Sequence, residues 1–314
     1  MEKRKIGSLA VSVVGVGCNN FGVRIDETRT KEVIDAAIAA GVNFFDTADM
    51  YADGRSEELI GRSLGSRRSQ VVIATKFGQT MPGKGTGAHH KYVGRALDGS
   101  LKRLHTDYVD LYQLHIPDPT VPIAETLGAL TDLVRAGKVR EIGCSNFSAL
   151  HLGEAAAEAT RLGYAHFVSV QNEYSLLYRV PESGVLAECE RTGIAFLPFF
   201  PLKSGLLTGK YRKGQPIPEG TRVAKYDRYR QLLTEENLDK VERLIDYAES
   251  RGHTVLELAI SWLLAHRPVA SVIAGASSAQ QVRANVNAAN WRLGATELDE
   301  IDMLLSRETK KGTV

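Results

Sequence analysis

Two short segments near the start of the chain place a carboxylate, a phenol and an amine close together. Asp46 and Tyr51 lie in Phe44-Phe45-Asp46-Thr47-Ala48-Asp49-Met50-Tyr51, and Lys76 ends the apolar run Val71-Val72-Ile73-Ala74-Thr75-Lys76. Each segment carries its polar groups just beyond a strand-like run, which is where α/β barrels carry their chemistry. A lysine held by a carboxylate stabilises the ionised form of a neighbouring phenol and lowers its pKa. Tyr51 is therefore predicted to act as a general acid.

A histidine completes this polar group. His115 ends the apolar run Val109–His115, and if the three runs are parallel strands, its side chain meets those of Asp46, Tyr51 and Lys76 at one rim. A histidine in that place can orient a carbonyl group. The four residues could polarise a C=O bond and protonate the resulting alkoxide, but they contain no source of electrons. We therefore expect a bound hydride donor.

The elements that position these residues alternate along the chain. Short β-branched runs predict strands, and segments of helical period separate them. The predicted strands are Val13–Gly17, Asn43–Asp46, Val71–Lys76, Val109–His115, Val139–Ser145, Phe167–Gln171, Ala195–Phe199 and Val272–Ala274. Helices are predicted over Thr30–Ala40, Ser56–Leu64 and Pro122–Ala136, each followed by a glycine. Eight such strands without a linker between halves predict an α/β fold, a (β/α)8 TIM barrel forming one domain over residues 1–314.

Three segments exceed the needs of a barrel. Arg4–Ser12 reads as an N-terminal hairpin that turns at Gly7-Ser8. A long loop follows the seventh strand, from about Lys203 to Thr234, and loops of that length in compact domains are usually functional. Extra C-terminal helices are predicted around Thr254–His266 and Thr296–Ser306.

Composition excludes several classes of function. The formal net charge is +2 and basic residues are dispersed among acidic ones, so no nucleic-acid partner is expected. The three cysteines, which show no CxxC spacing, argue against both a disulfide framework and a zinc site. His89-His90 brings no third ligand with it, and we predict no metal.

The amino-terminal residues superficially resemble a secretion signal. Lys3-Arg4-Lys5 precedes an apolar run, but that run is short, is broken by Ser12 and Gly15, and reads more naturally as the hairpin and first strand. No segment approaches the length of a membrane span. We therefore expect a cytoplasmic protein with no membrane partner.

The ordered motifs of the chain resemble those of the aldo-keto reductase family. They are Asp46-Thr47-Ala48-Asp49-Met50-Tyr51, Thr75-Lys76, Leu114-His115-Ile116-Pro117-Asp118, Gly143-Cys144-Ser145-Asn146-Phe147, Val170-Gln171-Asn172-Glu173-Tyr174-Ser175, Pro201–Tyr211 and Gly275-Ala276-Ser277-Ser278 leading to Asn285. The resemblance runs through nearly the whole chain. It implies a (β/α)8 barrel that binds NADPH without a Rossmann fold and reduces carbonyl groups. Asp46, Tyr51, Lys76 and His115 would then be the catalytic tetrad, with Tyr51 as proton donor.

The same resemblance implies a set of cofactor-binding residues. Ser145, Asn146 and Gln171 would hold the nicotinamide carboxamide, and Phe199 would stack on the ring where relatives place Tyr or Trp. The long loop looks like the family's cofactor clamp, in which Lys210 and Arg222 would face the phosphates. The remaining implied cofactor contacts lie along the clamp and the tail motif and are Phe200, Pro201, Leu202, Gly205, Leu206, Gly275, Ser277, Gln281 and Asn285. Because Gln281 stands where an Arg often faces the 2′-phosphate, NADPH is expected ahead of NADH but not to its exclusion.

A substrate pocket follows from the barrel arrangement. Phe21, Met50, Phe77 and Ile116 would line it, which makes it apolar with one polar apex. Ile116 replaces the Arg or Trp that many relatives carry after the histidine, which favours neutral ketones, aldehydes, or quinone-like and steroid-like carbonyls over phosphorylated ones.

Two other functions fit parts of the pattern. A Schiff-base aldolase with Lys76 as nucleophile explains Lys76 and Tyr51 but leaves the nicotinamide and clamp residues without a role. An NADPH-binding, redox-sensing regulatory subunit of slow turnover is suggested by the potassium-channel β subunits, which are similar in the clamp and tail motifs. No motif speaks to the oligomeric state, the natural substrate or the physiological direction.

Overall fold

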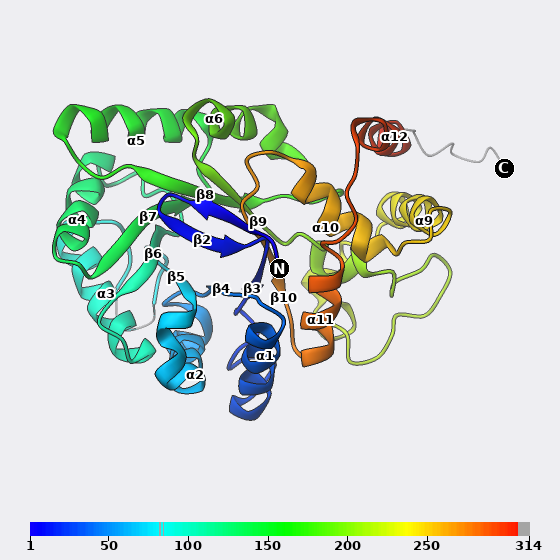
Figure 1. Ribbon diagram of the computed structural model, residues 1–314, viewed down its shortest axis with the longest axis horizontal. Helices are drawn as coiled ribbons and strands as arrows, with labels where there is room; N and C mark the ends of the chain where they lie inside the picture. Colours follow the sequence, from blue (N-terminus) through cyan, green and yellow to red (C-terminus); the bar gives the residue numbers. More distant parts are fainter. Residues whose placement is uncertain (82, 84, 307–314) are drawn as a thin grey trace.

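Eight parallel strands curl into a nearly closed barrel (Figure 1). The computed structural model describes residues 1–81, 83 and 85–306, and the final residues of the predicted domain, 307–314, lie outside the described residues. In their order around the sheet the strands are β10 (Val272–Gly275), β3 (Val14–Gly17), β4 (Phe44–Asp46), β5 (Val72–Phe77), β6 (Val109–Leu114), β7 (Val139–Ser145), β8 (Phe167–Glu173) and β9 (Ala195–Phe199). The predicted (β/α)8 barrel is thus confirmed, with strand ends shifted by one or two residues.

Hydrogen bonds connect β9 to the residues just before β10, and these two strands are the ends of the sheet order. The N–H of Phe196 in β9 donates to the carbonyl of Pro268 across 2.8 Å, and the N–H of Ala270 donates to the carbonyl of Phe196 across 3.0 Å. These residues directly precede β10, which pairs with β3 from Val272↔Val14 to Gly275↔Gly17. All the strands run in parallel, so their carboxyl ends gather at one rim.

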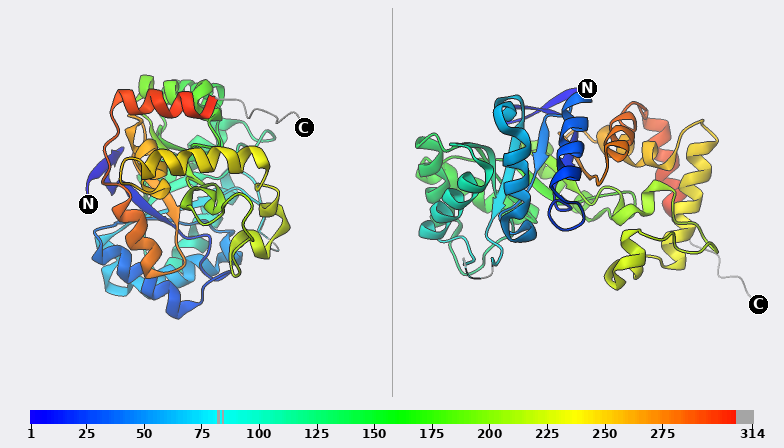
Figure 2. Two further views of the ribbon diagram at one scale, coloured as in Figure 1. Left: turned by 90° about the vertical axis from the view of Figure 1, so that its right-hand side faces the viewer. Right: turned by 90° about the horizontal axis from the view of Figure 1, so that it is seen from below.

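Helices surround the strands. The helices that alternate with the strands are α1 (Glu27–Ala39), α2 (Arg55–Leu64), α3 (His90–Leu104), α4 (Ile123–Arg135), α5 (Ala149–Leu162), α6 (Val185–Thr192), α10 (Val255–Ala265) and α11 (Ala279–Asn287). The long segment after β9 contains α7 (Arg222–Lys225), α8 (Asp227–Arg230) and α9 (Glu235–Glu249), and α12 (Ala295–Ser306) follows α11. In the right-hand view of Figure 2, α9 and α12 lie beside the barrel, and they contact each other. Within the described residues, no helix combines the length and apolar character needed to cross a bilayer.

Helix boundaries show where local signals were missed. The predicted helix Thr30–Ala40 starts one turn earlier, because the Asp26 carboxylate caps it and accepts from the N–H of Arg29 across 2.9 Å. His89 is the last residue before α3 and His90 is the first residue of that helix, and both side chains are exposed.

The N-terminal hairpin covers the amino ends of the barrel strands. Strands β1 (Lys3–Ile6) and β2 (Leu9–Ser12) pair antiparallel and turn at Gly7-Ser8 as predicted, with Gly7 at a φ of 54°. The apolar side chains of the hairpin join the barrel interior in one buried cluster, which includes Ile6, Leu9, Val11, Phe44, Val72, Leu111 and Leu197. Since Phe44 and Val72 are the first residues of their strands, the hairpin closes the amino end, and the carboxyl rim is left for chemistry.

Candidate active site

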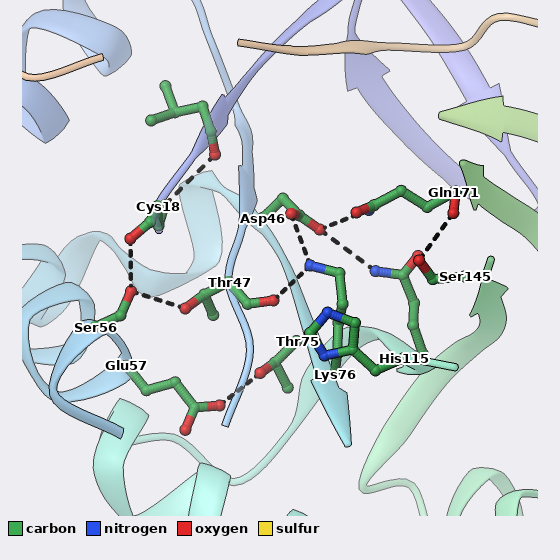
Figure 3. A network of polar contacts seen from close by, with 12 residues as sticks. Cys18, Asp46, Thr47, Ser56, Glu57, Thr75, Lys76, His115, Ser145 and Gln171 are labelled. Carbon is green, nitrogen blue, oxygen red and sulfur yellow. Dashed lines mark hydrogen bonds and ion pairs between the residues drawn. The ribbon is translucent and has the colours of Figure 1, made fainter. Parts of the chain in front are cut away.

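A buried ion pair lies at the carboxyl rim of the barrel. Asp46 is the last residue of β4 and Lys76 lies near the end of the neighbouring β5. The ammonium Nζ of Lys76 lies 2.7 Å from Oδ2 of Asp46 and also donates to the carbonyl of Thr47 across 2.8 Å (Figure 3). Lys76 is 0% exposed and Asp46 is 3% exposed. A buried charge needs such a partner, so the two residues form one unit.

The charge of Lys76 follows from its surroundings. Burial lowers its pKa, but the charges of Asp46 and Tyr51 and their hydrogen bonds raise it more, so that the net direction is upward. Lys76 is therefore a permanent ammonium at neutral pH. A protonated amine is not a nucleophile, which argues against the Schiff-base alternative.

Tyr51 lies directly beside this ammonium. The residue opens the short 3₁₀ helix η1 (Tyr51–Gly54), and Nζ of Lys76 is 5.2 Å from the centroid of its ring. Burial raises the pKa of the Tyr51 phenol, Lys76 lowers it and Asp46 raises it, and the net direction is upward. Lys76 does lower the pKa of the Tyr51 phenol, as predicted, but the larger effect of burial makes the net change a rise.

His115 lies against Tyr51 as a neutral imidazole. The two rings meet edge to face, with centroids 5.9 Å apart and planes at 77°. Burial, assisted by the charge of Lys76, lowers the pKa of His115 to about 3. Its Nδ1 is buried and has no hydrogen-bond partner among the described residues. A neutral imidazole can orient a carbonyl group but carries no proton to donate as an acid.

The residues predicted to hold the nicotinamide are joined to this group by hydrogen bonds. Nε2 of Gln171 donates to Oδ1 of Asp46 across 2.9 Å, and the Ser145 hydroxyl donates to the carbonyl of Gln171 across 2.8 Å (Figure 3). The amide of Asn146 donates to the carbonyl of His115 across 3.0 Å. The successive strands β7 and β8 thus deliver amide and hydroxyl groups to the same rim as Asp46 and Lys76.

Backbone strain gathers at this rim. The described residues other than glycine with positive φ are Ala52, Asp53, His105, Asn146, Phe200, Lys203 and Ser204. All except His105 adjoin Tyr51, Gln171 or the segment after β9. Such conformations cost energy and persist where the surrounding structure imposes them, often at functional sites.

The clamp residues follow β9. Phe199 and Phe200 are half-buried and meet edge to face with centroids 5.3 Å apart. Pro201 and Leu206 are buried, and Leu202 is half-buried. Gly205 has a φ of 100°, and a Cβ there would lie 2.8 Å from Nζ of Lys210, so glycine is required for this approach.

The tail residues lie after β10. Gly275 ends that strand and is exposed. The N–H and hydroxyl of Ser277 donate to Oε1 of Gln281 across 2.8 Å and 3.1 Å, and Asn285 is buried on α11. The side-chain oxygen of Gln281 is thus already bonded to Ser277.

These residues fit a dinucleotide cofactor. Buried polar atoms without a protein partner occur at the rim and in the clamp, namely Nδ1 of His115, Oδ1 of Asn172 and the hydroxyl of Tyr211. The aromatic residues Phe199 and Phe200 lie at the end of β9, and the cations Lys210 and Arg222 lie in the segment that follows this strand. Unsatisfied buried donors and acceptors of this kind call for a polar ligand.

The predicted pocket residues divide into two groups. Phe21 and Phe77 are fully buried, and Phe77 stacks on Tyr112 with centroids 4.6 Å apart. Met50 is half-buried and Ile116 is 39% exposed. Of the four residues, only Met50 and Ile116 present surface at the rim.

Sequence reasoning missed several polar residues around the site. Gln113 donates to Oδ1 of Asp46 across 3.4 Å, and it lies opposite Lys76 in the β5–β6 register. Thr75 donates to Glu57 across 2.5 Å, and Arg103 holds the same carboxylate at 2.7 Å. Alternate residues of a strand point to the same face, so Gln113 shares the face of His115 two residues later. This spacing is the sequence signal that could have identified Gln113.

Comparison with known proteins gives the chain a lineage. The family model described as aldo/keto reductase family matches residues 13–306. A probable voltage-gated potassium channel subunit beta from Oryza sativa subsp. japonica is 37% identical, covering 99% of this chain and 98% of the relative. An L-glyceraldehyde 3-phosphate reductase from Escherichia coli (strain K12) is 36% identical over 90% and 86% of the two chains. The aldo-keto reductase yakc [NADP(+)] of Schizosaccharomyces pombe is 34% identical over 95% and 89%.

Proposed function

Since the chain belongs to the aldo/keto reductase family and is an oxidoreductase by that membership, we propose that it reduces an aldehyde or ketone to an alcohol with NADPH, and that Tyr51 donates the proton. The observation that carries this proposal is the buried ammonium of Lys76. It is paired with Asp46 at 2.7 Å and lies 5.2 Å from the centroid of the Tyr51 ring. A phenol beside a fixed cation can protonate an oxygen on which negative charge develops.

Each residue of the group has a separate task. NADPH, when bound, supplies the hydride that adds to the carbonyl carbon. Tyr51 keeps its proton at neutral pH because burial raises its pKa, and Lys76 stabilises the phenolate left after the proton has moved to the substrate oxygen. His115 is neutral and orients that oxygen. Asp46 keeps Lys76 in place.

The proposed cofactor contacts combine amides, aromatic faces and cations. Ser145, Asn146 and Gln171 would orient the carboxamide, because amide groups both donate and accept hydrogen bonds. Phe199 would stack on the ring. NADPH in preference to NADH is supported by the clamp cations Lys210 and Arg222, which form no ion pair with the described residues, and by the NADP(+) in the name of the fission yeast relative. Phe200, Pro201, Leu202, Gly205, Leu206, Gly275, Ser277, Gln281 and Asn285 would complete the site.

The substrate and the location belong to the same proposal. A small neutral carbonyl compound is the proposed partner, since the predicted pocket residues Ile116 and Met50 are apolar and present surface at the rim. A cytoplasmic location is proposed because Cys18, Cys144 and Cys189 are all free thiols.

The deciding experiment is the substitution Tyr51→Phe. We expect the rate of carbonyl-dependent NADPH oxidation to fall by roughly 10² to 10⁴-fold, the usual contribution of a general acid. Binding of NADPH, measured by fluorescence titration, should persist. Tyr164→Phe is the matched control, because Tyr164 precedes β8 at the opposite end of the barrel. Unchanged carbonyl reduction by the Tyr51→Phe protein would refute the proposed mechanism.

A second candidate function is an NADPH-binding regulatory subunit of slow turnover. It is favoured by the rice relative, which is named as a potassium channel subunit beta and matches almost the full length of both chains. Turnover that stays slow across aldehydes, ketones and diketones, together with cofactor retained through purification, would favour it. Rapid turnover on any of these would favour the reductase.

A further inference from the structure

Three cations meet between two loops at the edge of the rim. Arg24 belongs to the loop between β3 and α1, whereas Lys210 and Arg222 belong to the segment after β9. The charges of Arg24 and Arg222, added to partial burial, lower the pKa of Lys210. Burial is the largest effect on Arg222 and lowers its pKa, Tyr229 and Tyr211 raise it, and the charges of Arg24 and Arg228 lower it further. The three side chains are therefore close enough to repel one another.

No carboxylate neutralises this cluster within the described part of the chain. The ion pairs there leave out Arg24, Lys210 and Arg222, although three neighbouring cations of the same segment each face a carboxylate. These neighbouring pairs are Lys203 with Glu173 at 2.6 Å, Arg212 with Glu242 at 2.6 Å, and Lys213 with Asp239 at 2.5 Å. The absence of a carboxylate thus distinguishes the three cations from Lys203, Arg212 and Lys213.

Asn20 holds the two loops together. It is 5% exposed, and its carbonyl accepts from the N–H groups of Val23, Arg24 and Ile25 at 3.2, 2.8 and 3.2 Å, which shapes a tight turn. Its side-chain Oδ1 accepts from Nη2 of Arg222 across 3.0 Å. An aspartate here would pair with Arg222, but the neutral amide leaves the positive charge of the cluster uncompensated.

The cluster adjoins the proposed cofactor site. A Cβ on Gly275, the last residue of β10, would lie 3.5 Å from Nδ2 of Asn20. An anion between converging cations relieves their repulsion, and phosphate groups match both the forked donors of arginine and the point charge of lysine. The ligand chemistry is therefore that of a multiply charged phosphate.

We propose that Arg24 completes, with Lys210 and Arg222, a three-cation phosphate site that holds the dinucleotide and fastens the segment after β9 to the loop after β3. The proposal rests on NADPH as the cofactor of the proposed function and adds Arg24 to the residues that bind it. Without the phosphate, the mutual repulsion of the cations weakens the contact between the two loops. A bound phosphate contacts cations from both loops and so connects them.

The test measures binding and stability, not turnover. We would titrate the full chain with NADP⁺, NAD⁺ and inorganic pyrophosphate, comparing wild type with Arg24→Gln and Asn20→Asp. Arg135→Gln on α4, whose side chain is 64% exposed, controls for net charge. Arg24→Gln should weaken NADP⁺ binding by about ten-fold or more, since a hydrogen bond to a charged group is lost. Asn20→Asp should do the same by pairing with Arg222, and Arg135→Gln should not.

The pattern of losses identifies the phosphate. An equal loss for NADP⁺ and NAD⁺, with pyrophosphate weakened as well, assigns Arg24 to the bridging phosphates. A loss confined to NADP⁺ assigns it to the 2′-phosphate, and both outcomes support the site. Unchanged affinities in Arg24→Gln, or the same losses in Arg135→Gln, overturn it. Because these assays need no substrate, a protein that binds NADP⁺ through Arg24 yet reduces no carbonyl would refute the proposed function alone.

Thermal melting separates a binding role from a structural one. Arg24→Gln should melt at or above the wild-type temperature without ligand, because it relieves repulsion, yet gain less from NADP⁺. Limited proteolysis within residues 203–234 should be slowed by NADP⁺ in the wild type and much less in the variant. A variant that melts lower without ligand and keeps the full gain from NADP⁺ would show that Arg24 is merely structural.

Discussion

The side-chain amide of Gln171 donates a hydrogen bond to Oδ1 of Asp46 across 2.9 Å. The other oxygen of that carboxylate holds Lys76 at 2.7 Å. Gln171 belongs to the residues proposed to orient the nicotinamide, whereas Asp46 fixes the ammonium beside the phenol. In the proposed function, the placement of the cofactor and the placement of the proton donor are therefore coupled through one carboxylate.

This coupling predicts that Gln171→Leu lowers both kcat and NADPH affinity, each by roughly ten-fold, because a hydrogen bond to a buried charge is lost. Steady-state kinetics and fluorescence titration measure the two effects. Gln113→Leu is the matched control. Its amide reaches the same oxygen only at 3.4 Å and its Oε1 has no partner among the described residues, so its effect should be small. A Gln171→Leu protein with normal kcat would contradict the coupling.

The buried ion pair predicts an asymmetric effect on stability. Lys76→Met removes the partner of a carboxylate that is 3% exposed, and breaking a buried pair in this way costs about 3 to 5 kcal/mol. The double variant Asp46→Asn with Lys76→Met removes both charges and should recover much of that loss. Urea unfolding of wild type, both single variants and the double variant measures the coupling. Additive losses would show that the two residues do not act as a pair.

The sequence predicted the barrel and the proximity of Asp46, Tyr51, Lys76 and His115 because both depend on local signals. Apolar runs that end in glycine or a charged residue mark strand ends, and parallel strands bring those ends to one rim, as Asp46 and Lys76 illustrate. The sequence alone could not predict contacts that depend on strand register, such as the contact between Gln113 and Asp46. It also could not predict the extent of burial. Burial reverses the net pKa direction of Tyr51, and it places Phe21 and Phe77 inside the core.

The lowered pKa of His115 predicts a loss of stability on the acid side. Its folded-state pKa of about 3 lies below the ordinary 6.5, so between these values the unfolded chain binds the extra proton. The contribution of His115 to the free energy of unfolding should therefore be constant above pH 6.5. It should fall as the pH drops toward 3, by at most about 1.4 kcal/mol per pH unit. His115→Gln should flatten this dependence, while His90→Gln, exposed on α3, should leave it intact. Urea unfolding at a series of pH values provides the measurement, and parallel curves for wild type and His115→Gln would count against a buried neutral imidazole.

A second buried carboxyl predicts the opposite pH dependence. Asp49 is 0% exposed and neither of its oxygens accepts a hydrogen bond of good geometry among the described residues, although its N–H donates to the carbonyl of Lys76 across 3.0 Å. Burial and the charge of Glu57 raise its pKa to about 7, against smaller lowering effects of Met50 N–H, Arg103 and Lys76. Arg103 cannot neutralise Asp49, because Glu57 already holds it at 2.7 Å. Asp49 is therefore protonated in the folded protein below neutral pH.

The folded state thus binds a proton that the unfolded chain lacks between the ordinary pKa of 3.8 and about 7. The contribution of Asp49 to stability is complete below the lower value and is lost as the pH rises through the upper one, by at most about 1.4 kcal/mol per pH unit. Asn reproduces the shape of the neutral carboxyl, so Asp49→Asn should remove this loss and be more stable than wild type at pH values above about 7. Asp98→Asn, whose side chain is 61% exposed, should leave the pH dependence unchanged. A wild-type protein that loses no stability between pH 5 and pH 8 relative to Asp49→Asn would mean that this carboxyl is ionised and has found a partner.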